Sequence, residues 1–260
     1  MSRRKIQGLR AILTGASSGI GRELARQLGR QGAKLVLVAR RKERLQELAA
    51  ELEATGGAEL VPGDITDPSV RQTAVYRAES RFGGLDALVN NAGVGALGRF
   101  ENAHPERVRH LMEVNFFAVV EMTRLALPLL RQGNRPILVN VASVLGHRAT
   151  PLGSEYCASK FAIRGFSESL RAEWTRHGID VLVVSPGTTE TEFFEQVIEQ
   201  TEVPTWPAVG AATAASVARQ IIRAMRRGRH EIIPHRWARL LVWLNRLSPR
   251  LVDAIMARYG

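Results

Sequence analysis

The sequence has little cysteine and no long apolar run. Its 260 residues include a single cysteine, which excludes a disulfide framework and a cysteine-based zinc site. No apolar stretch reaches the roughly 18 residues that cross a bilayer. The basic start, residues 1–8, is not followed by the apolar segment of a secretory signal. We therefore expect a cytoplasmic protein in a reducing compartment.

Acidic residues are also scarce relative to basic ones, 25 against 36, which gives a formal charge of +11. The excess is local, because residues 219–260 contain ten arginines and only two acidic residues, whereas residues 1–218 contain 26 basic and 23 acidic residues. A nearly neutral body argues against a general nucleic-acid binder, so no nucleic-acid partner is expected.

The body of the chain alternates apolar strands with helices. Strands are predicted at residues 11–14, 34–39, 59–62, 86–90, 136–142, 179–185 and 231–234. Helices are predicted at residues 22–30, 42–54, 68–82, 105–130, 155–177 and about 212–227, the third starting at Asp67-Pro68. Strands that are apolar on both faces and separated by helices predict an α/β, Rossmann-type doubly wound parallel sheet of about seven strands, with helices on both faces.

A glycine-rich loop follows the first predicted strand. Residues 14–21 read Thr-Gly-Ala-Ser-Ser-Gly-Ile-Gly and lead directly into a helix. Glycines allow a tight turn, and the N–H groups of the helix start favour an anion such as a pyrophosphate. The spacing differs from the common G-x-G-x-x-G fingerprint, so a plain glycine-rich turn stays open as the alternative.

Two arginines, Arg40 and Arg41, follow the second predicted strand. An NAD site has an acidic residue there, about 20 residues after the glycine loop, to bind the ribose 2′-hydroxyl. A guanidinium instead pairs with a 2′-phosphate through two parallel bonds. NADP(H) is therefore the expected cofactor. The alternative is that both arginines merely solvate a helix start, where cations oppose the helix dipole.

A tyrosine and a lysine stand four residues apart at the start of the second long helix. Tyr156 and Lys160 share one helix face, so the ammonium is expected to lower the phenol pKa from its usual value near 10. Ser143 ends the fifth strand, at the edge where parallel sheets form ligand crevices. Taken singly, the pair also fits a solvated helix face, and Ser143 fits a strand-end cap.

Together these motifs resemble the short-chain dehydrogenase/reductase family, in its single-domain branch. The matching residues fall in family order between roughly residues 8 and 233. They are residues 14–21, Asp64, residues 90–93, Asn115, Ser143, Tyr156, Lys160, Pro186 and Gly187.

The resemblance implies a role for each matching residue. Tyr156 would be the catalytic acid and base, Lys160 would also bind the nicotinamide ribose, Ser143 would hold the substrate carbonyl, and Asn115 would anchor a water linking Lys160 to solvent. The cofactor would contact Gly15, Ser17, Ser18, Gly19, Ile20, Arg40, Arg41, Asp64, Ile65, Asn91, Ala92, Gly93, Tyr156, Lys160, Pro186, Gly187, Thr188 and Thr191. No metal is expected, since the six histidines show no ligand spacing.

The expected function is hydride transfer between NADP(H) and the carbonyl or secondary alcohol of a hydrophobic substrate. The loop after the Pro-Gly motif carries apolar residues that suggest a ketoacyl, steroid-like or other lipid-like compound, unless they pack on the loop's own core. These are Phe193, Phe194, Val197, Ile198, Val203 and Trp206. The alternative function is a catalytically silent cofactor sensor or scaffold. Such proteins commonly lose the catalytic tyrosine or lysine, and both are present here.

The last residues form a basic extension to the expected dehydrogenase domain. We divide the chain into that domain, residues 1–234, and a C-terminal helical extension, residues 235–260. In the extension, Trp237, Leu240, Leu241, Leu244 and Leu247 share a helix face, Arg236, Arg239 and Arg246 share another, and Ser248-Pro249 begins a second helix.

Two roles stay open for this extension: contact with a membrane surface, or packing on the body or a partner subunit. A homo-oligomer, dimer or tetramer, is expected through the helices at 105–130 and 155–177, because the family resemblance implies it.

Overall fold

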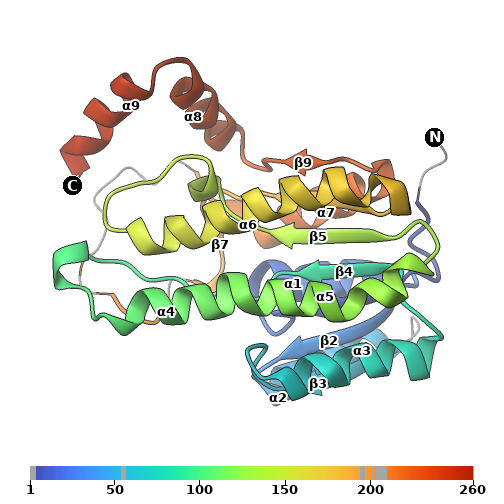
Figure 1. The fold of residues 1–260 in the computed structure, drawn as a ribbon. Helices are drawn as coiled ribbons and strands as arrows, with labels where there is room; N and C mark the ends of the chain where they lie inside the picture. Colours follow the sequence, from blue (N-terminus) through green and yellow to red (C-terminus); the bar gives the residue numbers. More distant parts are fainter. Residues whose placement is uncertain (1–3, 54–56, 194–196, 201, 203–209, 260) are drawn as a thin grey trace.

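A seven-stranded parallel sheet forms the centre of the molecule (Figure 1). The computed structural model describes residues 4–53, 57–193, 197–200, 202 and 210–259. The strand order is β3-β2-β1-β4-β5-β6-β9. The strands are β1 (Arg10–Thr14), β2 (Lys34–Ala39), β3 (Ala58–Pro62), β4 (Ala87–Asn90), β5 (Ile137–Val141), β6 (Asp180–Val184) and β9 (Glu231–Ile232). The predicted Rossmann-type doubly wound sheet is confirmed.

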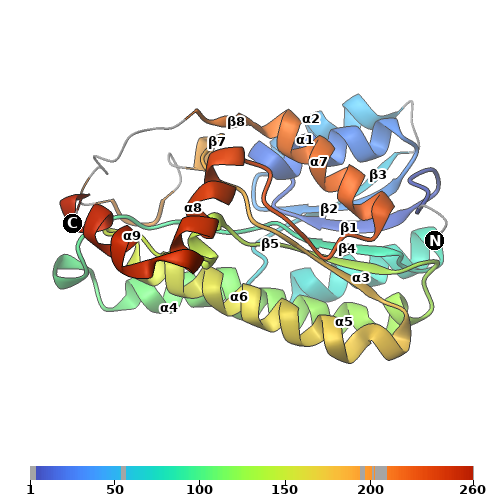
Figure 2. The same cartoon turned by 90° about the horizontal axis from the view of Figure 1, so that it is seen from above.

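Helices cover both faces of the sheet, as Figures 1 and 2 show. One layer contains α1 (Gly19–Arg30), α2 (Lys42–Leu52) and α7 (Ala214–Arg227); the other contains α3 (Pro68–Phe82), α5 (Ala118–Arg131) and α6 (Ser154–Glu173). Successive side chains of a strand point to opposite faces. Leu13 of β1 therefore packs in the cluster of α1 and α7, and Ile12 in that of α5 and α6.

The helix predicted at residues 105–130 is interrupted in the structure. It comprises α4 (Glu106–Met112), a π-helical turn η3 (Glu113–Phe117) and α5. A π turn inserts one extra residue without ending the helix, so the apolar period does not reveal it. The predicted helix at residues 155–177 is α6 followed by the 3₁₀ turn η5 (Trp174–His177). Asp67 caps α3 as predicted, its carboxylate accepting from Ser69 N at 2.7 Å.

The sheet has its switch point between β1 and β4, where the chain reverses the direction in which strands are added. In such folds ligands bind in the crevice outside the carboxyl ends of the strands at that point. The glycine loop follows β1, residues 91–93 follow β4, and the short strands β7 (Thr189–Glu190) and β8 (Ala212–Thr213) pair beyond β6.

The C-terminal extension forms α8 (Arg236–Leu247) and α9 (Pro249–Met256) at one end of the molecule (Figure 2). Ala238 and Val242 pack on Val144, which directly follows Ser143. Ser248 precedes α9 as predicted, although its side chain makes no cap hydrogen bond. Within the described ranges, every helix is too short or too polar to traverse a lipid bilayer.

Candidate active site

The glycine loop is hydrogen-bonded to the segment that directly follows β4. Thr14 Oγ1 accepts from the backbone N–H groups of Asn91 and Ala92, both at 3.0 Å, and Asn91 Nδ2 donates to Thr14 O at 3.0 Å. A Cβ at Gly15, whose φ is +69°, would lie 2.7 Å from Asn91 Nδ2. Glycine is therefore required there by both conformation and space.

The helix that follows this loop begins without a side-chain cap. Ser18 occupies the N-cap position of α1 but makes no side-chain cap hydrogen bond, and only its carbonyl accepts, from Arg22 N at 3.0 Å. The first N–H groups of a helix have no partner within the helix. Those at Gly19 and Ile20 are therefore suited to an anion. This uncapped helix start fits the pyrophosphate of a dinucleotide.

A basic cluster lies beside the loop, and it contains Arg44 as well as the predicted Arg41. Arg41 donates from Nε and Nη2 to Ser17 Oγ at 3.2 and 3.1 Å. Arg41 and Arg44 both pair with Glu192, at 2.9 and 2.7 Å. The Arg40 side chain is exposed and makes no hydrogen bond or ion pair with the residues that the structure describes. Arg44 was not predicted from the sequence, although it follows Arg41 at i, i+3 spacing at a helix start.

Asn115 lies in the π turn and joins three segments. Its Oδ1 accepts from Val94 N at 2.9 Å, and its Nδ2 donates to Val94 O and to Ser159 Oγ, each at 3.0 Å. A Cβ at Gly93 would lie 3.0 Å from Asn115 Oδ1 and 3.3 Å from Lys160 Nζ. Asn115 therefore holds the segment after β4 against α6, next to Lys160.

Tyr156 and Ser143 lie together at the edge of the sheet. Burial raises the pKa of the Tyr156 phenol above its usual value, and the nearby Ser143 hydroxyl offsets this only in part. The prediction that Lys160 lowers this pKa below its usual value was therefore wrong for the cofactor-free protein. Ser143 also accepts from Leu145 N at 3.1 Å, so it caps the turn η4 (Val144–Gly146) as well.

Lys160 is buried beside Tyr156. Its Nζ lies 5.6 Å from the centroid of the tyrosine ring and donates to Val141 O at 3.3 Å. Burial lowers the pKa of Lys160 to about 8. Both side chains project from the same face of α6, as the spacing of four residues predicted.

The segment after β6 contacts both the glycine loop and the surroundings of Tyr156. Pro186 O accepts from Val144 N at 2.8 Å, and Thr188 O accepts from Ala212 N at 3.0 Å. Thr191 Cγ2 would lie 3.0 Å from a Cβ at Gly19, and the Phe193 ring lies 5.9 Å from the Tyr156 ring. The apolar loop residues Phe194, Val203 and Trp206 lie outside the described residues.

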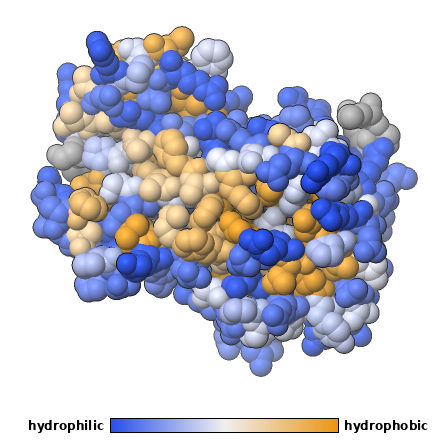
Figure 3. Space-filling model, viewed as in Figure 1, coloured by the Kyte–Doolittle hydropathy of each residue, from blue (hydrophilic) through white to orange (hydrophobic). Residues whose placement is uncertain are grey.

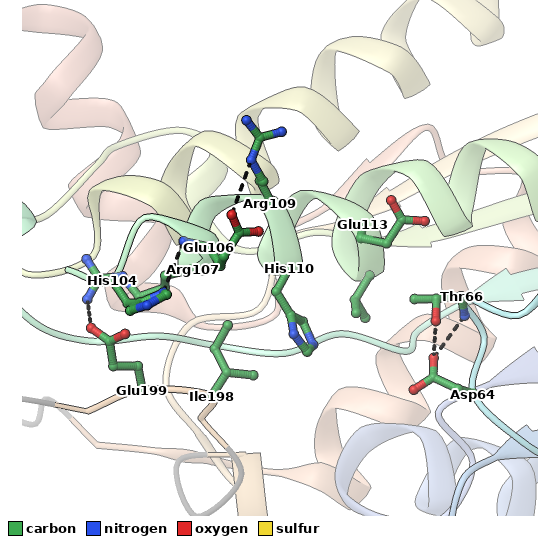
Figure 4. Close-up of a pocket in the computed structure, with 11 residues that line it drawn as sticks. Asp64, Thr66, His104, Glu106, Arg107, Arg109, His110, Glu113, Ile198 and Glu199 are labelled. Atoms are coloured by element: carbon green, nitrogen blue, oxygen red, sulfur yellow. Dashed lines mark hydrogen bonds and ion pairs between the residues drawn. The ribbon is translucent and has the colours of Figure 1, made fainter.

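A cavity of about 560 Å³ opens between α4 and the end of β3 (Figure 4). Asp64 and Thr66 line one side and His110 projects from α4 toward it. Asp64 Oδ1 accepts from Thr66 N and Oγ1, at 2.9 and 2.8 Å. Asp64, one of the residues expected to contact the cofactor, lies at the edge of this cavity, and Ile65 packs against the neighbouring cluster of Val94, Leu111 and Val114.

Two buried polar residues lie near the site, and the sequence predicted no role for either of them. His147 lies in the loop after Ser143 and contacts Ser185 Oγ at 3.0 Å and Glu231 at 3.2 Å. Arg107 of α4 is 4% exposed and pairs with Glu155, the neighbour of Tyr156. The signal for Arg107 was its i, i+4, i+7 spacing with Leu111 and Val114, which places it on the buried face of a helix.

These features define the class of protein. A glycine loop and uncapped helix start at the switch point fit a dinucleotide phosphate, and a Ser–Tyr–Lys cluster beside it fits acid–base chemistry on a carbonyl. A parallel α/β fold with this site is that of a nicotinamide-dependent oxidoreductase.

The comparison with known proteins gives the same class of protein. The family model for short chain dehydrogenases matches residues 10–202, so the chain belongs to that family. The 11-beta-hydroxysteroid dehydrogenase A of Sesamum indicum is 35% identical over 95% of this chain and 74% of its own length.

Two solved structures share the fold and bind different cofactors. A short chain dehydrogenase/reductase from Burkholderia phymatum, in complex with NAD, has a TM-score of 0.86 and 26% identity over 95% of this chain and 96% of its own. One from Burkholderia cenocepacia, in complex with NADP, has a TM-score of 0.79 and 29% identity over 88% of this chain and 97% of its own.

Proposed function

We propose that this protein is an NADP(H)-dependent oxidoreductase acting on an apolar ketone or secondary alcohol. The observation that carries the proposal is the grouping of Ser143, Tyr156 and Lys160 at the carboxyl edge of the sheet, with Lys160 Nζ 5.6 Å from the centroid of the Tyr156 ring. A bound nicotinamide cofactor would supply or accept the hydride.

The protein's own residues would position the carbonyl and move the proton. Ser143 orients the substrate oxygen by a hydrogen bond, and Tyr156 donates its phenolic proton to that oxygen in reduction. The raised pKa of Tyr156 keeps the phenol protonated at neutral pH. Lys160, charged below its pKa of about 8, lies close enough to stabilise the phenolate that forms. In oxidation the proton moves the opposite way.

The preference for NADP(H) rests on the basic cluster after β2. Arg41, which contacts Ser17, and Arg44 meet at Glu192, after the strand where an NAD site would have an acidic residue. Two guanidinium groups favour a 2′-phosphate, which one of the two similar solved structures has in its cofactor and the other lacks.

The preference for an apolar substrate rests on the side chains around Tyr156. Phe193 lies against the Tyr156 ring, and Val197 Cγ1 would lie 3.2 Å from a Cβ at Gly95. The name of the sesame relative refers to a hydroxysteroid. We therefore propose a steroid-like, ketoacyl or other lipid-like carbonyl compound.

Turnover with a cofactor and ketone panel tests this function. We expect NADPH oxidation with a bulky apolar ketone such as a decalone, and a kcat/KM at least about tenfold lower with NADH, because NADH gives Arg41 and Arg44 no phosphate. The decrease in absorbance of the reduced nicotinamide measures the rate with NADPH and with NADH. Binding of NADPH without turnover of any ketone or alcohol would instead support the cofactor-sensing or scaffolding alternative.

An apolar patch on α5 and α6 favours a second copy of the chain as partner. Figure 3 shows apolar side chains gathered across this face. Phe117, at the end of η3 just before α5, and Phe161 of α6 are both exposed. Phe116 and Phe166 extend the patch through edge-on ring contacts. We propose a homo-oligomer, a dimer or tetramer, formed through these helices; sedimentation of the intact chain measures its mass.

The C-terminal extension leaves its main apolar face uncovered. Only the small side chains Ala238 and Val242 of α8 are buried on the body, whereas Trp237, Trp243 and Leu247 are exposed. The exposed arginines Arg236, Arg239, Arg246 and Arg250 flank that face. Basic charge beside exposed tryptophan and leucine suits an anionic lipid surface, and we propose that residues 235–260 contact one.

Vesicle binding tests this contact with a matched pair of variants. Leu247 and Phe100 are both 73% exposed, but only Leu247 belongs to the extension. Leu247→Ser should weaken co-sedimentation with anionic phosphatidylglycerol vesicles about tenfold, since a buried leucine is lost from the interface. Phe100→Ser should leave it unchanged. If the intact protein does not bind these vesicles at all, the proposed contact is wrong.

A further inference from the structure

Glu192 binds the same two arginines that would recognise the cofactor's 2′-phosphate. We propose that Glu192 is a placeholder for that phosphate: it occupies the site in the free protein and must leave when NADP(H) binds. This inference rests on the NADP(H) preference proposed above, and it makes Glu192 a residue that sets the affinity for the phosphate.

The contacts are specific on both sides of the carboxylate. Glu192 Oε2 accepts from Arg41 Nη1 at 2.9 Å, and Oε1 accepts from Arg44 Nη1 at 2.7 Å. Arg41 turns its Nε and Nη2 to Ser17 Oγ. One carboxylate therefore bridges two guanidinium groups at the lip of the glycine loop. These hydrogen bonds hold the pKa of Glu192 below its usual range, so it is ionised at neutral pH.

A phosphate dianion and this carboxylate would compete for the same donors. Both are anions that accept charge-assisted bonds from guanidinium N–H groups, and like charges at contact distance repel. The three side chains are only half-buried, with 31% of Arg41, 37% of Arg44 and 33% of Glu192 exposed. Partly exposed ion pairs contribute little, so a phosphate with more acceptor oxygens can displace Glu192.

The backbone around Glu192 ties this exchange to the rest of the crevice. Thr191 lies against Gly19 of the glycine loop, and Phe193 lies against Gly95 and the Tyr156 ring. The pairing of Glu192 therefore fixes a three-residue segment that reaches from the phosphate end of the crevice to the catalytic tyrosine. A cofactor that lacks the 2′-phosphate would leave that pairing in place.

Calorimetric binding of two nucleotide fragments tests the placeholder without turnover. The fragments are 2′,5′-ADP, which carries the 2′-phosphate, and 5′-AMP, which does not. Glu192→Gln should tighten 2′,5′-ADP binding about fivefold, because the competing charge is removed, and should leave 5′-AMP binding unchanged. Arg44→Gln should remove most of the preference for 2′,5′-ADP.

Glu190→Gln is the matched control. Glu190 is two residues earlier, is exposed and makes no ion pair among the residues that the structure describes. The Glu190→Gln substitution removes the same charge from the same segment. Any increase in phosphate affinity that comes only from the lower net negative charge therefore appears in both variants. The proposed role of Glu192 is wrong if Glu192→Gln and Glu190→Gln change the affinity for 2′,5′-ADP equally, or if Glu192→Gln weakens 2′,5′-ADP binding. If the unaltered protein binds both fragments equally, the NADP(H) preference itself fails, and the placeholder with it.

Discussion

Tyr156→Phe is expected to lower kcat about a thousandfold for ketone reduction, while NADPH binding and the unfolding midpoint stay close to those of the unaltered protein. The substitution removes one hydroxyl and keeps the ring that contacts Phe193. Positioned acid–base groups contribute typically about 10²–10⁴-fold. Ser143 lies near the phenol but is itself a poor proton donor, and Lys160 donates to Val141 O instead.

Tyr76→Phe is the matched control for this prediction. Tyr76 lies on α3, 65% exposed and far in the sequence from the site. The same loss of one hydroxyl there should change kcat less than twofold. Single-turnover rates with saturating NADPH measure both variants. Turnover by Tyr156→Phe within tenfold of the unaltered rate would show that another group supplies the proton.

The sequence could predict the parts of the site whose geometry follows from local spacing. The glycine loop after β1 and the Tyr156–Lys160 pair on α6 each depend on a few neighbouring residues, and both lie where predicted. The parallel sheet could be predicted because its strands are apolar on both faces. Ile12 and Leu13, neighbours in β1, pack in the hydrophobic clusters on opposite faces of the sheet. The position of a residue whose contacts are local can be predicted from its own segment of the sequence.

The remaining features depend on contacts between distant segments. Arg40 and Arg41 were equivalent in the sequence, but the turn into α2 exposes Arg40 and directs Arg41 to Ser17, with Arg44 one helical turn on. The pKa of Tyr156 was expected to fall because Lys160 was adjacent, but burial of the phenol raises it. Burial is set by the whole fold, so helix spacing alone gave the wrong sign.

The ion pair between α4 and α6 was not predicted, because it too joins segments that are distant in the sequence. Arg107 lies 48 residues before Glu155 in the chain, yet their side chains are paired and nearly inaccessible, 2% and 9% exposed. Arg107 also pairs with Glu199, at 2.8 Å. Three elements thus meet at one guanidinium, next to the residue that precedes Tyr156. A sequence shows charged residues in a helix but does not show which distant carboxylate they meet.

Arg107→Met is therefore expected to destabilise the protein by about 3–5 kcal/mol. Methionine fills a similar volume but leaves the Glu155 carboxylate buried without its partner, and breaking a buried pair costs about this much. The start of α6 should loosen as well, so kcat should fall together with stability. Urea unfolding followed by circular dichroism measures the change, with an unaltered slope expected if the unfolded state is unaffected.

Arg109→Met, two residues away on the same helix, separates this effect from a general loss of charge. Arg109 is 79% exposed and lies 3.8 Å from Glu106, which is itself 69% exposed. Surface pairs of this kind contribute about 0–1 kcal/mol, so this variant should unfold within about 0.5 kcal/mol of the unaltered protein. If Arg107→Met is no less stable than Arg109→Met, then Glu155 is satisfied by other groups, and the tie between α4 and α6 does not hold Tyr156 in place.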